Sequence, residues 1–139
     1  MRIGFTGTRN GMTEFQKQEV ERILIFHCYA LDLEAHHGDC MGADAQFHQF
    51  AQKYGYPIII HPSNLNTRVY CQGAIRIYEP KNALIRNCDI VDSVDIMIAT
   101  PAQNYEILRS GTWATIRYAR KVGRVIHIIY PKPDIGEKI

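Results

Sequence analysis

The stretch that decides the fold reads Ile96-Met-Ile-Ala-Thr-Pro101 and, after a short polar insert, Arg109-Ser-Gly-Thr-Trp-Ala-Thr-Ile-Arg-Tyr-Ala-Arg120. The apolar run predicts a strand, and the segment behind Ser110, Gly111 and Thr112 predicts a helix whose free N–H groups point toward the end of that strand. A helix N-terminus favours anions, the two hydroxyls add donors, and the glycine lets a ligand approach closely. The stretch therefore predicts a phosphate site. The plainer interpretation is a capped helix with a buried stripe of Trp113, Ile116, Ala119 and Val122.

Composition limits the class of protein. The 139 residues, with a net charge of +2 and 22% charged residues, are typical of about one domain without the basic field that drives nucleic-acid binding. We expect a single nucleotide-binding domain over residues 1–139, with a polar tail from about residue 131. No apolar stretch approaches ~20 residues and no leader pattern is present, so a cytoplasmic protein without membrane contact is expected.

Cysteine usage does not favour a metal site. Four widely spaced cysteines form no C-x-x-C pair: Cys28, Cys40, Cys71 and Cys88. Zinc could recruit His36, His37 and Cys40, but neighbouring residues of an extended strand point to opposite faces. We therefore expect reduced thiols, no metal and no cofactor.

Hydrophobic periodicity predicts alternating strands and helices. Strands are expected over residues 1–5, 34–37, 57–61, 95–100 and 125–130. Helices are expected from the T-x-x-Q capping box at Thr13 to about residue 30, up to about residue 54, over 81–91, and from 112. This order predicts an α/β three-layer sandwich with a mainly parallel five-stranded sheet. The polar segment 62–80 between strand and helix could be a mobile flap over a ligand.

Ligand-binding side chains are expected where parallel strands end, since ligands of such sheets bind outside the carboxyl ends. Glycines, hydroxyls and arginine gather there, at Gly7, Thr8 and Arg9 after the first strand, Gly38, Asp39, Gly42, Ala43 and Asp44 after the second, and His61 after the third. The loops contain no G-x-G-x-x-G, no G-K-[ST] and no G-x-S-x-G. This excludes the commoner dinucleotide, P-loop and hydrolase motifs.

Four short motifs in register resemble the SLOG superfamily of Rossmann-like nucleotide-binding proteins. They are Gly7-Thr8-Arg9, His37-Gly-Asp-Cys-Met-Gly-Ala-Asp44 with His48, Arg86-Asn87, and Ser110-Gly-Thr-Trp113. That group includes DNA-processing DprA/Smf proteins, cytokinin-activating Lonely Guy hydrolases, and sensor domains for NAD-derived antiviral signals. The resemblance spans nearly the whole chain and is compatible with a stand-alone viral or prokaryotic member.

The resemblance implies roles for individual residues. Gly7-Thr8-Arg9 is similar to the Gly-Ser-Arg of the DprA branch, whose arginine meets phosphate, and Gly42-Ala43-Asp44 with His48 is similar to that branch's Gly-Ile-Asp and histidine. Asp44 and His48 share a helix face and could bind ligand or lock loop to helix. By analogy with dinucleotide folds, Asp39 could accept from a ribose hydroxyl.

Arg86-Asn87 resembles the ribose-phosphate motif of the Lonely Guy branch. The acidic position of that branch, however, falls on Ala114. We therefore expect non-catalytic binding, by sensing or sequestration, of a nucleotide or ADP-ribose-type signalling molecule by a homo-oligomer. The candidate residues for stacking on a base are Trp113, Tyr105 and Tyr70.

Two alternatives remain open from the sequence. One is an N-glycoside hydrolase of nucleoside 5′-monophosphates in which Glu106 or Glu79 replaces the missing acid. The other is a DprA-like single-stranded DNA binder, which the modest net charge does not favour.

Overall fold

The structure is a computed structural model that describes residues 1–133; most of the polar tail expected from about residue 131 lies outside the described residues. The elements follow one another as β1 (Arg2–Gly7), α1 (Glu14–His27), β2 (Glu34–His37), α2 (Ala43–Lys53), β3 (Ile58–Ile60), β4 (Arg76–Ile77), α3 (Ala83–Ser93), β5 (Ile96–Thr100), α4 (Gly111–Lys121) and β6 (Val125–Ile128).

The strands form one parallel sheet in the order β4-β3-β2-β1-β5-β6. The central pair is β1 and β5, with Ile3 opposite Ile96 and Gly7 opposite Thr100. Every residue of β3 and β5 is buried, as expected for strands covered on both faces. The parallel α/β class is confirmed, but the sheet has six strands in the described residues rather than five, because β4 forms inside the segment 62–80.

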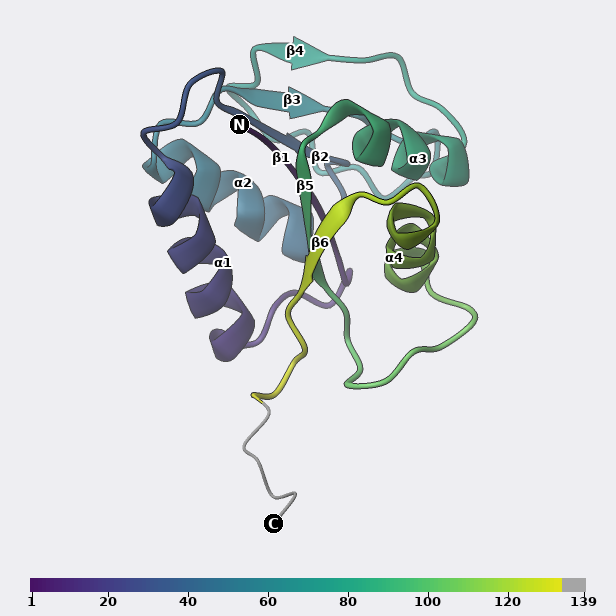
Figure 1. Cartoon of the computed structure of the whole chain (residues 1–139). Coiled ribbons are helices and arrows are strands. Elements are labelled where there is room, and N and C mark those ends of the chain that lie inside the picture. The colour runs from purple at the N-terminus through teal and green to yellow at the C-terminus, as the bar shows by residue number, and fades with distance from the viewer. Residues whose placement is uncertain (134–139) are drawn as a thin grey trace.

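The molecule has three layers, with α1 and α2 on one face of the sheet and α3 and α4 on the other (Figure 1). On the first face Phe5 of β1 stacks on Phe47 of α2 with ring centroids 4.5 Å apart. On the second face Met97 of β5 packs with Ile90, Val91 and Ala119 of the two helices. Both helix layers therefore bury apolar residues against the same sheet.

Local sequence signals explain where the helices begin. The capping box is confirmed, since the Thr13 hydroxyl accepts from Gln16 N and the Gln16 side chain accepts from Thr13 N. One inward assignment was wrong. Val122 is 44% exposed because α4 ends at Lys121.

The strand order reverses direction between β1 and β5. From β1 the chain moves outward through β2, β3 and β4, and then returns to place β5 on the other side of β1. Parallel pairing brings the carboxyl ends of these strands to one edge, together with the N-termini of the helices that follow them. A binding crevice is expected at this reversal. In the part of the chain that is described, no helix has the length and apolar character needed to cross a membrane.

Candidate functional site

A cavity of about 510 Å³ lies at the reversal between β1 and β5. Its floor is the loop after β1, and its walls come from α3, from the β5–α4 connection and from the start of α4. This volume falls within the range of small-molecule sites. Ten of the fourteen residues expected from the sequence line it: Gly7, Thr8, Arg9, Gly38, Asp44, Arg86, Asn87, Ser110, Gly111 and Thr112.

The N-terminus of α4 opens into this cavity. The Ser110 hydroxyl caps the helix by accepting from Trp113 N at 3.2 Å, and the Ser110 carbonyl accepts from Ala114 N. The N–H groups of Gly111 and Thr112 are used by neither bond. A Cβ at Gly111 would meet no atom within 4 Å, so this glycine borders open space. The start of α4 therefore offers free N–H donors to a ligand.

Arg86 is held rigidly in the wall formed by α3. Its Nη1 donates to the carbonyls of Gly38 (2.9 Å) and His61 (3.0 Å), and its Nε donates to Asn87 Oδ1 (2.7 Å). Its Nη2 contacts only the Cys40 sulfur, at 3.7 Å. Arg86 is buried, with 7% of its surface exposed, yet it pairs with no carboxylate among residues 1–133. Because no carboxylate neutralises this buried guanidinium, its positive charge is available to an anion in the cavity.

Two further arginines line the cavity from exposed positions. Arg9 follows β1, and Arg109 precedes α4. Neither donates a side-chain hydrogen bond or forms an ion pair within the described residues. Arg109 was not among the residues expected from the sequence, because it lies in the polar insert. Three arginines thus face one carboxylate, that of Asp44, and the wall carries excess positive charge.

Asp44 is buried at the base of the cavity. One of its oxygens accepts from Gly38 N (3.2 Å) and Cys40 N (3.1 Å), and so fixes the loop after β2. Burial raises the pKa of Asp44 to about 6, although these N–H groups and the charge of Arg86 act in the opposite direction. Asp44 and His48 share a helix face but form no hydrogen bond with each other, so each locks a different part of the loop region.

Asp39 does not line the cavity, in contrast to the ribose contact expected from the sequence. Its side chain is fully buried and accepts from Arg68 Nε (2.6 Å) and Cys71 N (2.9 Å). Burial opposes ionisation of this carboxylate, but those hydrogen bonds outweigh it and the pKa of Asp39 is lowered. Its oxygens are committed to the segment 62–80, which they tie down. No residue of that segment lines the cavity.

Gly42, Ala43 and His61 also lie outside the cavity lining. Gly42 has φ +85°, and a Cβ there would stand 2.2 Å from the Arg9 carbonyl oxygen, so the loops after β1 and β2 can cross only at a glycine. Ala43 N donates to Thr8 O (3.0 Å), so this N–H group at the start of α2 is already used within the protein. The His61 ring bonds to His36 instead (2.8 Å). These residues shape the site without facing it.

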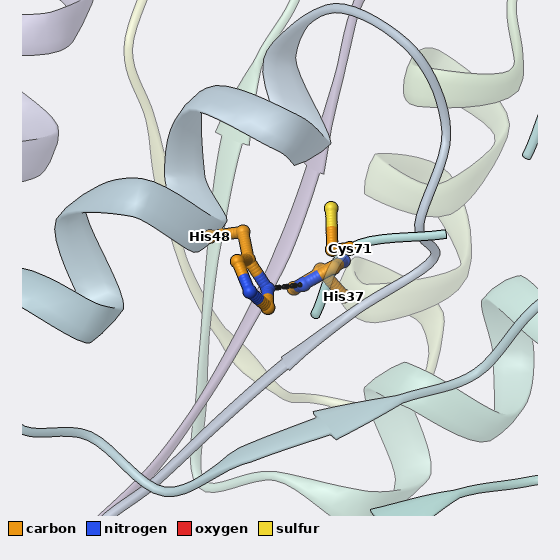
Figure 2. A group of neighbouring side chains, drawn as sticks. All are labelled: His37, His48 and Cys71. Atoms are coloured by element: carbon orange, nitrogen blue, oxygen red, sulfur yellow. Dashed lines mark hydrogen bonds between the residues drawn. The ribbon is translucent and has the colours of Figure 1, made fainter. Parts of the chain in front are cut away.

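The buried His37 and His48 and the half-buried Cys71 form a cluster behind the loop after β2, and Figure 2 shows the two rings joined by a hydrogen bond. Asp39 N donates to His37 Nδ1 (2.9 Å), so the proton of His37 is on Nε2, which donates to His48 Nδ1 (2.9 Å). His48 Nε2 then donates to the carbonyl of Gln72 (2.7 Å). Every ring nitrogen is thereby satisfied in neutral form.

This proton order does not fit a metal site, although the three ligand atoms lie within 4.8 Å of one another. A metal on His37 Nε2 would displace the proton that the Asp39 N–H group fixes there. Burial raises the pKa of the Cys71 thiol to about 12 and lowers the pKa of His37 to about 3. Neutral imidazoles and a protonated thiol indicate a structural hydrogen-bond chain, and we assign no metal to it.

The acids considered for catalysis lie away from the cavity. Glu106 is exposed and pairs with Arg117 at 3.0 Å, while Glu79 is exposed on the connection after β4. Ala114 does not line the cavity either. Of the aromatic residues considered for base stacking, Trp113 is 1% exposed in the core, and neither Tyr70 nor Tyr105 lines the cavity.

Fold and site together define a Rossmann-like α/β protein with a donor-rich cavity at the switch point of its sheet. The sequence matches no family model and no curated protein. Solved structures do match. DprA from Streptococcus pneumoniae aligns with a TM-score of 0.69 and 18% identity, over 97% of this chain and 52% of DprA.

Two further structures have a similar fold. The molybdenum cofactor binding protein from the phototrophic bacterium Rippkaea orientalis aligns with a TM-score of 0.67 and 17% identity, over 94% of this chain and 77% of the other. The structural-genomics target TM1055 aligns with a TM-score of 0.64 and 13% identity, over 90% and 71%. The chain thus has a Rossmann-like α/β fold similar to the folds of these three proteins.

Proposed function

We propose that this protein binds a nucleotide or a nucleotide-derived small molecule through its phosphate, in the cavity between β1 and β5. One observation carries the proposal: Arg9, Arg86 and Arg109 converge with the free N–H groups of α4 on a single cavity of about 510 Å³. Guanidinium groups and a helix N-terminus are the donors that suit phosphate. One structural neighbour is a molybdenum cofactor binding protein, which is consistent with a small-molecule ligand.

The role that we propose for this binding domain is sensing or sequestration. We propose an ADP-ribose-type signalling molecule as ligand, and anti-phage defence signalling as the setting, because the motifs resemble the SLOG superfamily, which includes sensor domains for such signals. Neither Glu79 nor Glu106 reaches the cavity, and Ala114 occupies the acidic position of the hydrolase branch. Departure of a base needs a carboxylate beside the sugar, so binding without turnover is expected.

N-glycoside hydrolysis is the second candidate, and Asp44 is the observation that favours it. Asp44 is the only carboxylate among the lining residues, and burial raises its pKa to about 6, in the range of a general acid. Incubation with AMP and with ADP-ribose, followed by chromatography for free base, tests this reading. Multiple turnovers that disappear in Asp44→Asn would replace the binder by an enzyme; no base release supports the binder.

Single-stranded DNA binding is the third candidate, prompted by the similarity to a DNA-processing protein. The net charge of +2 gives little basis for a basic path along a strand. Fluorescence anisotropy with a labelled oligonucleotide should show no salt-dependent binding, whereas a steep loss of affinity with salt would favour DNA.

Calorimetric titration tests the main proposal directly. AMP and ADP-ribose should bind with saturation, while adenosine and ribose, which carry no phosphate, should bind far more weakly or not at all. Equal affinity for adenosine and AMP would overturn a phosphate-centred site.

Self-association belongs to the proposal as well. The end of α1 and the turn after it expose Phe26 (81%), Tyr29 (96%) and Leu31 (86%). Such a patch on a soluble domain favours association with a second copy. Light scattering should show an oligomer for the native chain and a monomer for Phe26→Ser/Tyr29→Ser; a monomeric native chain would contradict this.

A further inference from the structure

The amide of Asn87 is fixed in orientation by its neighbour. Arg86 Nε carries a hydrogen and can only donate, so the atom that it meets at 2.7 Å is the Asn87 oxygen, Oδ1. Asn87 lines the cavity from α3, and its NH₂ group donates to no protein acceptor within residues 1–133. This side chain therefore offers two N–H donors to the cavity and no free carbonyl.

The same device occurs on the facing connection between β5 and α4. The indole N–H of Trp113 can only donate, and it meets Gln103 Oε1 at 3.2 Å. Trp113 is buried in the core, so the amide of Gln103 is held in place by a rigid neighbour. Gln103 lines the cavity, and across the described part of the chain its NH₂ group has no protein acceptor.

The α3 wall and the facing β5–α4 wall consequently both present hydrogen-bond donors to the cavity. Neutral amides ordinarily offer an acceptor and a donor, but here both acceptors are used inside the protein. The three lining arginines are donors by nature. The Asp44 carboxylate is the exception, and two backbone N–H groups already occupy one of its oxygens. A ligand meets donors on the α3 wall, from Arg86 and Asn87, and again on the α4 wall.

We propose that Asn87 and Gln103 determine specificity, and that the ligand carries an acceptor-rich anionic group against each wall: a nucleoside diphosphate or a diphosphate ester. This inference rests on the proposed function and deepens it by naming the two amides that select a diphosphate over a monophosphate. A monophosphate satisfies the donors of one wall and leaves those of the other unpaired. Two linked phosphates engage Arg86 with Asn87 on one side and Gln103 with the start of α4 on the other. Neutral groups that must donate, such as an exocyclic amine, find no acceptor at either amide.

The test is a calorimetric series on the native chain with adenosine, AMP, ADP and ADP-ribose, and with phosphate and pyrophosphate as base-free probes. We expect ADP and ADP-ribose to bind at least about tenfold more tightly than AMP, because each added charge-assisted contact is a strong one. Pyrophosphate should likewise bind more tightly than phosphate. If AMP and ADP bind equally well, the diphosphate inference is wrong while nucleotide binding stands. If no phosphorylated ligand binds, both are wrong.

Variants test the two amides. Asn87→Asp and Gln103→Glu each replace an amide donor by a carboxylate. Each should raise the dissociation constant of ADP tenfold or more, with little change in melting temperature. Asn82→Asp is the matched control, because it adds the same charge at the start of α3, where Asn82 Oδ1 accepts from Leu84 N outside the cavity. If Asn82→Asp weakens the binding of ADP as much as Asn87→Asp does, the loss comes from the added negative charge alone and the assignment of Asn87 fails.

The orientation itself is tested through Trp113. Trp113→Phe removes the indole N–H and frees the Gln103 amide to rotate, so the ratio of AMP to ADP dissociation constants should fall. A purely structural role would lower the melting temperature and leave that ratio unchanged. An unchanged ratio in folded Trp113→Phe would therefore overturn the role given to Gln103.

Discussion

Arg9→Ala separates a binding role from a structural one more cleanly than any other change in the cavity. Arg9 is exposed, lines the cavity and makes no side-chain hydrogen bond or ion pair within residues 1–133. Its removal should therefore change the free energy of unfolding by less than about 0.5 kcal/mol, as for other surface positions. Loss of one hydrogen bond to a charged group costs roughly 1.5–3 kcal/mol of binding. This corresponds to a rise in the dissociation constant of roughly 10- to 150-fold.

Arg86→Ala provides the contrast. It removes the donors of two buried carbonyls, Gly38 O and His61 O, each of which costs about 1–3 kcal/mol when left unsatisfied. At about 2–4 °C per kcal/mol, the melting temperature should fall by roughly 5–20 °C. Titration calorimetry with ADP-ribose measures the binding affinity of both variants, and differential scanning calorimetry measures their melting temperatures. If Arg9→Ala binds as well as the native chain, or if it melts as early as Arg86→Ala, the assignment of Arg9 is refuted.

Three further changes test the rest of the account. Gly111→Val should leave the fold intact, since no atom lies within 4 Å of its Cβ position. It should weaken the binding of ADP-ribose at least tenfold by blocking the start of α4. Unchanged affinity in calorimetry would remove that helix from the site. Burial lowers the pKa of His37 to about 3 and that of His61 to about 4, so the folded state binds fewer protons than the unfolded chain below pH 6.5. The free energy of unfolding in urea should fall as the pH drops from 6.5 toward 4, with Asp44 offsetting only part, and a flat profile would contradict the neutral histidines. Because the pKa of Asp44 is raised to about 6, affinity for ADP-ribose should fall as the pH rises through 6, and this dependence should be absent in Asp44→Asn; a dependence retained there would assign it to another group.

Periodicity and loop chemistry were enough to predict the parallel sheet, its order of elements and most of the cavity lining. They failed at β4, because Arg76–Ile77 is too short to show any alternation inside a polar segment. They also failed at Arg109 and Gln103, which lie in the insert before α4. That insert is held by contacts that no spacing in the sequence reveals, among them Gln103 with Trp113 and Arg117 with the carbonyls of Ile107 and Leu108.

Asp39 shows a second limit of sequence reasoning. Its place after a strand suggested a ligand contact, yet its partners Arg68 and Cys71 lie about thirty residues further along the chain. The glycines of the loops were expected to admit a ligand. At Gly38 and Gly42 the atoms nearest a Cβ belong to Arg86 and Arg9 instead, whereas Gly111 borders open space.

The most direct test of the central claim is amide NMR of isotope-labelled protein titrated with ADP-ribose. A phosphate at the start of α4 and beside the loop after β1 should shift the N–H signals of Gly111, Thr112 and Arg9 in a saturable way, with one dissociation constant. The signals of Ala43 and Asp39, whose N–H groups donate within the protein, should move far less. Saturable shifts at Gly111 and Thr112 are the predicted result. Binding that leaves those two signals unmoved, or no binding at all, would contradict the proposed site.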